Sequence, residues 1–192
     1  MIVFPRLLVD LLDQVDQTRA AHLALDFVQH VLDIERDEIA ESVLAACLEY
    51  IAAAHESIDL DEAHPGLFQA RERLWEAAAR WDVNRYVLAR GAGPTLEAAR
   101  VGTERLVDKA AGRGPGTPLP CLDVARELQA EVGRWYAKRI PDGADERLVA
   151  RRARWEEARW QVQHVIATEP SPHGDKDSTA PSRGEKEAGA GA

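Results

Sequence analysis

Apolar residues recur along most of this chain at the spacing of an amphipathic helix. The clearest case begins at Leu67, where the apolar positions follow one another in steps of three or four: Leu67, Ala70, Leu74, Ala78 and Trp81. Side chains at that spacing lie on one face of a helix and are buried together. The pattern predicts helices over residues 5–34 (with or without a break at 16–18), 37–56, 67–82 (or to 87), 95–111, 121–139 and 144–168.

Segments rich in proline and glycine separate these stretches, at residues 65–66, 91–94, 112–120 and 140–143. Proline and glycine end regular structure, so each segment predicts a turn or a loop. No run of alternating apolar and polar residues reaches the length of a strand, and a sheet is therefore not expected. The sequence predicts an all-α domain over residues 1–168, built as an irregular bundle of six or seven helices.

The composition changes after Thr168 to mainly Pro, Gly, Ser, Lys, Asp and Glu, and alanine is the only apolar residue type. Such a segment cannot form a core, so residues 169–192 are predicted to be a disordered C-terminal tail. No apolar run of 18 residues occurs, and the N-terminus lacks the basic region of a signal peptide. We therefore expect a cytoplasmic protein without membrane contact. Cys47 and Cys121 fall on apolar helix faces, where a free cysteine acts as a small hydrophobic residue.

Charge is distributed unevenly along the chain, whose total net charge is −9. Residues 1–62 contain 14 Asp and Glu against three arginines, a net charge of −11. Residues 63–168 contain 18 Lys and Arg against 14 acids, a net charge of +4. An acidic region repels phosphate and steers basic proteins, so the expected partner is a protein and not a nucleic acid. Its candidate contact residues are Glu38, Glu41 and Asp59; the alternative is a surface that only keeps the protein soluble.

One group of polar residues suggests a metal site: His22, Asp26 and His30 lie along one helix face at i, i+4 and i+8. Two imidazoles and a carboxylate bind a divalent metal if another helix adds a ligand, such as Glu49 or His55. Bundle metal sites more commonly use Glu-x-x-His pairs, and the sequence has none. We therefore predict no bound metal and no cofactor, with a ligand- or metal-binding bundle as the alternative.

Five tryptophans lie in the C-terminal two-thirds of the chain: Trp75, Trp81, Trp135, Trp155 and Trp160. Trp81 and Trp155 fall on inward stripes and are predicted to be core. Trp75 and Trp160 come off those stripes beside charged residues, and exposed tryptophan is enriched at protein interfaces. Both are candidate partner contacts, unless their helices bury two faces.

The arginine-rich segment 146–160 contains interleaved acids at helical spacing, as with Arg152 and Glu156. This pattern is typical of a solvated, ion-paired helix and not of a nucleic-acid surface. The sequence also lacks the Gly-x-Ser-x-Gly and His-Glu-x-x-His motifs of hydrolases and the phosphate-binding loop. No catalytic residue is proposed, and the pattern favours a protein that is not an enzyme.

Three segments, 24–32, 45–55 and 154–161, resemble the small helical immunity proteins encoded beside bacterial polymorphic toxins. The resemblance covers about 30 residues of Ala-rich and Trp-containing helix. It implies a cytoplasmic protein that binds and blocks a toxin domain without catalysis. The expected function is therefore non-enzymatic protein binding, with a basic toxin domain as the sharpest candidate partner. A small regulatory domain without its own DNA-reading helix is the remaining alternative.

Overall fold

The computed structural model describes residues 4–82, 85–114, 119–141 and 145–169, without the side chains of residues 81–86. Within these ranges the chain forms seven α-helices, which confirms the predicted all-α bundle. The tail predicted after Thr168 lies outside the described residues, apart from Glu169. The helices are α1 (Phe4–Leu12), α2 (Gln17–Glu35), α3 (Glu41–Asp59), α4 (Pro65–Ala78), α5 (Ala92–Ala110), α6 (Cys121–Ala137) and α7 (Glu146–Ala167).

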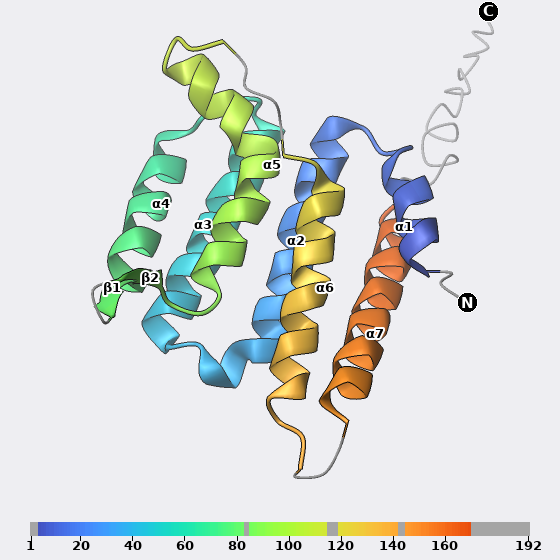
Figure 1. The fold of residues 1–192 in the computed structure, drawn as a ribbon. Coiled ribbons are helices and arrows are strands. Elements are labelled where there is room, and N and C mark those ends of the chain that lie inside the picture. The colour runs from blue at the N-terminus through green and yellow to red at the C-terminus, as the bar shows by residue number, and fades with distance from the viewer. Residues whose placement is uncertain (1–3, 83–84, 115–118, 142–144, 170–192) are drawn as a thin grey trace, which may run out of the picture.

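The helices are arranged around two central elements, α2 and α3, which lie side by side (Figure 1). Helix α5 packs across both of them, α4 packs on α3, and α6 packs between α2 and α7. Helix α1 packs on α7, so α4 forms one edge of the bundle and α7 with α1 forms the other (Figure 1). No helix in the described part of the chain is both long and apolar enough to cross a membrane.

The core lies where these helices meet, and its largest buried side chains include Phe27, Leu32 and Leu74, each at most 1 % exposed. Burying one such side chain stabilises the fold by about 1.5–3 kcal/mol. The sequence left open whether the helix breaks at residues 16–18, and the structure interrupts it slightly earlier, between Leu12 and Gln17. Asp16 caps α2 by accepting a hydrogen bond from the backbone N–H of Arg19 at 2.9 Å. This cap separates α1 from α2 because it satisfies an N–H group that has no partner within the helix.

One prediction that proved wrong concerns residues 79–88, which form an antiparallel hairpin of strands β1 (Ala79–Asp82) and β2 (Arg85–Leu88). Helix α4 therefore ends at Ala78, and Trp81 belongs to a strand and not to a helical stripe. The segment combines aromatic and β-branched residues, which favour strands. The predicted burial of Trp81 concerns a side chain outside the described set.

The buried face of α7 was also predicted wrongly. The apolar spacing of this helix predicts that Leu148, Trp155, Val162 and Ile166 are buried. Only Val162 is buried, whereas Leu148, Trp155 and Ile166 are 53 %, 40 % and 52 % exposed. The true inward face is partly polar, since Glu157 and Gln161 are 2 % and 0 % exposed. The Gln161 side chain is satisfied there, because its Nε2 donates to the carbonyl oxygen of Ala125 at 3.3 Å. A hydrophobic stripe cannot locate a face that is buried with polar residues.

Candidate functional site

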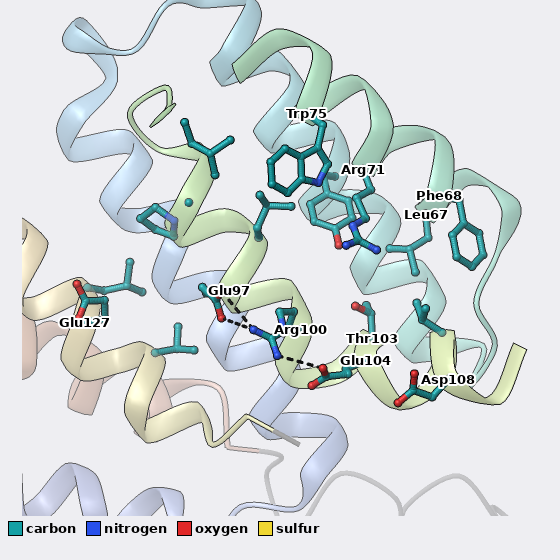
Figure 2. A pocket seen from close by; sticks show the side chains of 18 of the residues that line it. Leu67, Phe68, Arg71, Trp75, Glu97, Arg100, Thr103, Glu104, Asp108 and Glu127 are labelled. Carbon is teal, nitrogen blue, oxygen red and sulfur yellow. Dashed lines mark hydrogen bonds and ion pairs between the residues drawn. The ribbon is translucent and has the colours of Figure 1, made fainter. Parts of the chain in front are cut away.

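A groove of about 790 Å³ lies along the outer face of α5, between α4 and α6 (Figure 2). It exists because α4 packs mainly on α3 while α6 packs on α2 and α7, so neither helix covers α5. The exposed face of α5 lines the groove from Gly93 to Asp108. That stretch corresponds to a length of roughly 22 Å at the rise of an α-helix.

The walls of the groove are largely apolar. Helix α4 contributes Leu67, Phe68 and Trp75, and α6 contributes Val124 and Leu128. Phe68 is 41 % exposed, and Trp75 is half-buried. Figure 2 shows Trp75 and Leu67 on the side of α4 that faces α5. The groove therefore offers apolar surface to a molecule that lies along α5.

The floor of the groove carries a ladder of charges on α5. The two terminal nitrogens of Arg100 lie 3.0 Å from carboxylate oxygens of Glu97 and of Glu104 (Figure 2). The hydrogen bond that Arg100 donates to Glu104 and the charge of Glu97 raise the pKa of Arg100, so its guanidinium group stays charged at any physiological pH. These three residues neutralise one another in part, which leaves shape and apolar contact as the main features of the groove.

A polar spot lies beneath the α4 wall. Tyr50 is 3 % exposed, and burial raises the pKa of its hydroxyl group. Arg71, which also lines the groove, forms no ion pair with any carboxylate in the described ranges. The positive charge of Arg71 acts on Tyr50 and opposes part of that rise. Arg71 is therefore a cationic side chain available to an acidic group of a bound partner.

Of the predicted contact residues, only Trp75 lines the groove. Glu41 is exposed at the start of α3, and Asp59 lies 3.1 Å from His22 Nε2 at the end of that helix. Glu38, in the 3₁₀ turn η1 (Arg36–Glu38), forms ion pairs with Arg90 and Arg139. The structure thus does not bring these three acids and Trp75 into one surface.

The acidic region is partly neutralised by folding, which the sequence could not reveal. Arg90 lies 3.0 Å from Glu35, and Arg105 lies 2.5 Å from Asp61. Arg73 pairs with Glu49 in the same way. Each of these arginines comes from the basic part of the chain. Burial raises the pKa of Glu35 to about 7, although the charge of Arg90 opposes the rise.

The three residues of the metal hypothesis belong to a larger cluster, which contains four of the six histidines. His22 Nδ1 lies 2.6 Å from Nδ1 of His55, so one ring donates to the other. Asp26 lies between two imidazoles, 3.7 Å from Nε2 of the same His55 and 2.8 Å from His164 Nε2. This part of the cluster joins α2 to α3 and to α7.

The rest of the cluster is a stack of rings around Trp160, the other tryptophan predicted to contact a partner. Its ring stacks on His30 at 3.6 Å between centroids and on His164 at 4.9 Å. His30 Nε2 also lies 3.4 Å from the buried carboxylate of Glu157. Trp160 is therefore held between His30 of α2 and His164 of its own helix, α7. The position of His164 was not predicted, because it depends on the α7 face that the apolar pattern misplaced.

His22, Asp26 and His30 do not converge, because His22 faces α3 whereas His30 stacks on Trp160. In the described ranges, no three His, Cys, Asp or Glu side chains are arranged to hold a metal ion. Cys47 and Cys121 are buried and unpaired with each other. Burial raises the pKa of Cys121 to about 12, which keeps the thiol protonated and unreactive.

Comparison with known proteins adds no relative: the chain matches no protein-family model, no curated protein and no solved structure. The resemblance to immunity proteins therefore rests on the three helical segments alone.

Proposed function

We propose that this protein is a non-enzymatic protein-binding domain that holds a segment of its partner in the groove between α4 and α6. The observation that supports it is the uncovered face of α5, walled by Phe68 and Trp75 on one side and by α6 on the other. Long, open, apolar grooves between helices are a common docking site for amphipathic helices. At roughly 22 Å, the floor accommodates about four turns of such a helix.

Neutralisation of a toxin is the sharpest form of this proposal, and it rests on the resemblance to immunity proteins. Such a protein acts in the cytoplasm by covering part of the toxin, and a groove that binds one segment tightly serves that purpose. The acidic surface plays a smaller part than the sequence predicts. Glu38 and Asp59 already have cationic or imidazole neighbours, so they contribute less to attraction of a basic partner.

The test starts from the products of genes next to the one that encodes this chain. A toxin domain among them is co-expressed with the protein, and growth rescue is measured before the affinity is determined by calorimetry. Phe68→Ala and Trp75→Ala should each weaken binding by at least about tenfold, since buried aromatic residues are frequent hot spots. Tyr136→Ala is the matched control: Tyr136 is 42 % exposed, close to the 41 % of Phe68, but does not line the groove.

Two results would overturn the proposal. Equal affinities for the groove variants and the control would move the contact elsewhere on the surface. Absence of any bound protein among the neighbouring gene products would remove the toxin version. Thermal melting of each variant separates loss of contact from loss of fold.

The second candidate is a ligand- or metal-binding bundle that uses the histidine cluster; a metal would require its side chains to rearrange, since no three of them are arranged to hold one in the described ranges. Its support is the close approach of His22, His55 and Asp26 at a half-exposed surface. Elemental analysis of untagged protein tests it. Near one equivalent of zinc, iron or nickel, lost in His22→Ala, would establish the metal function in place of the first proposal.

A further inference from the structure

The outer face of α7 carries an unusual line of exposed apolar side chains. Leu148, Trp155 and Ile166 are 53 %, 40 % and 52 % exposed, and they are separated by 7 and 11 residues. These separations correspond to about two and three turns, so the three side chains lie on one line along the helix. Phe4 of α1 makes a T-shaped contact with the Trp155 ring, at 5.0 Å between centroids.

The charges along the same helix are divided between its two halves. The first half carries Arg147, Arg151, Arg152 and Arg154, all exposed, and none forms an ion pair with a described carboxylate. These four arginines outnumber the exposed acids at the same end, which are Asp145, Glu146 and Glu156. The second half has one exposed arginine, Arg159, which pairs with Glu156 at 3.5 Å. Its other exposed residues are uncharged or acidic: Gln163, Ile166, Ala167, Thr168 and Glu169. The C-terminal end of a helix also carries a partial negative charge.

Helix α1 adds to this division of charge, because it lies beside the second half of α7 (Figure 1). Phe4, at the start of α1, contacts Trp155. Arg19, in the first turn of α2 that follows α1, donates to the carbonyl oxygen of Val165 at 2.6 Å. The exposed carboxylates of Asp10 and Asp13, with Arg6 of the same helix, are therefore carried near the second half of α7. That end of the edge carries more acids than arginines, whereas the first half of α7 carries more arginines than acids.

We propose that this edge binds a second copy of the same chain, with the two α7 helices antiparallel about a two-fold axis near residue 157. This register places Leu148 opposite Ile166 of the second copy, and Trp155 opposite Arg159. Arg159 then stacks over an indole ring, a favourable cation–π geometry. The basic half of each α7 meets the acidic end of the other, as an isologous interface requires of a self-complementary surface.

Other arrangements fit these observations less well. A parallel pair would place the four unpaired arginines of one copy against those of the other, which like-charge repulsion disfavours. An anionic membrane or a nucleic acid would attract the arginines but would meet Asp10, Asp13 and Glu169 at the other end. Only an antiparallel second copy satisfies both halves and covers the apolar line.

The first experiment measures the mass of the full chain in solution by light scattering and by sedimentation across a range of concentrations. We expect a dimer that dissociates on dilution. Trp155→Asp and Leu148→Asp should each weaken dimerisation by at least about tenfold, because a charge then replaces an interface residue. Leu60→Asp is the control, since Leu60 is 57 % exposed at the end of α3, away from α7. Circular dichroism confirms that each variant keeps its helices.

The second experiment tests the direction of the helices with Leu148→Cys and Ile166→Cys variants and a short bifunctional maleimide. The native cysteines are buried and do not compete. A mixture of the two variants should cross-link efficiently, whereas each variant alone should not. A monomer at all concentrations, a dimer unaffected by the α7 variants, or self-linking of Leu148→Cys would each overturn the proposal. Binding to vesicles of anionic lipid, lost in Trp155→Asp, would replace the second copy with a membrane.

Discussion

Gly102 sits at the closest approach of three helices and gives the sharpest test of the packing. It lies in the middle of α5, where that helix crosses α2 and α3. A Cβ atom added to Gly102 would lie 2.6 Å from the Cβ of Ala21 and 2.6 Å from Cδ1 of Ile58. Ile58 has rotamers with which to move aside, but the Ala21 Cβ is fixed to the backbone of α2.

The magnitude follows from two opposing effects of Gly102→Ala. Restoring ordinary contact at about 3.5–4 Å requires α5 to move away from α2 by about 1 Å, which loosens the packing around it. Overpacking of this kind costs about 1–3 kcal/mol, whereas replacing glycine by alanine within a helix contributes about 1 kcal/mol. We therefore expect a net loss of up to about 2 kcal/mol in the free energy of unfolding.

The assay is chemical unfolding followed by circular dichroism and tryptophan fluorescence. Gly93→Ala is the matched control in the same helix, because a Cβ added there meets nothing within 4 Å. The control should be neutral or stabilise by up to about 1 kcal/mol, so the two changes shift the midpoint in opposite directions. Equal or parallel shifts would refute the close packing of α5 on α2.

Three further predictions concern buried groups. Glu35 binds more protons in the folded than in the unfolded state between pH 4.5 and about 7. Its contribution to the free energy of unfolding therefore falls as pH rises through that window, by at most about 3 kcal/mol. Glu35→Gln should flatten this part of the pH dependence of unfolding. Desolvation lowers the pKa of His55, so stability should fall as pH drops below 6.5, and His55→Phe should reduce that slope measured by denaturant unfolding between pH 7 and 5. Trp160→Ala should destabilise by about 3–5 kcal/mol and Trp155→Ala by clearly less, measured by the same unfolding, because only Trp160 is stacked on both ring faces.

The helices could be predicted from the sequence because their buried faces are mostly apolar. The stripe Leu67, Ala70, Leu74 and Ala78 is buried throughout, as its spacing predicts. The same reasoning failed on α7, where buried Glu157 and Gln161 interrupt the pattern and Trp155 lies outside. It also extended α4 into the hairpin at 79–88, since short strands lack a periodic signal strong enough to compete with a preceding helix.

The candidate site could not be predicted from the sequence, because it depends on how far α4 and α6 lie apart on the face of α5. The groove is lined by α4, α5 and α6, whose packing order the sequence does not determine. Trp75 could be singled out because it lies off the apolar stripe beside charged residues, whereas Phe68 gave no comparable signal. The neutralisation of Glu35 and Asp61 by Arg90 and Arg105 is likewise a property of the fold, since those partners are far apart in the chain.

The two proposed surfaces belong to different helices, the groove to α4, α5 and α6 and the second surface to the outer face of α7, and this makes them testable apart from each other (Figure 1). Pairing through α7 leaves the face of α5 open in both copies, so a dimer presents two grooves. A partner with two binding segments would then gain affinity from an increased effective concentration, without any new contact. Trp155→Asp should remove that gain while the affinity for a partner with a single segment stays unchanged. Phe68→Ala should weaken both interactions and leave the dimer intact. If Trp155→Asp instead weakens binding of the single-segment partner, then the α7 edge belongs to the partner contact, and the groove is not the only surface involved.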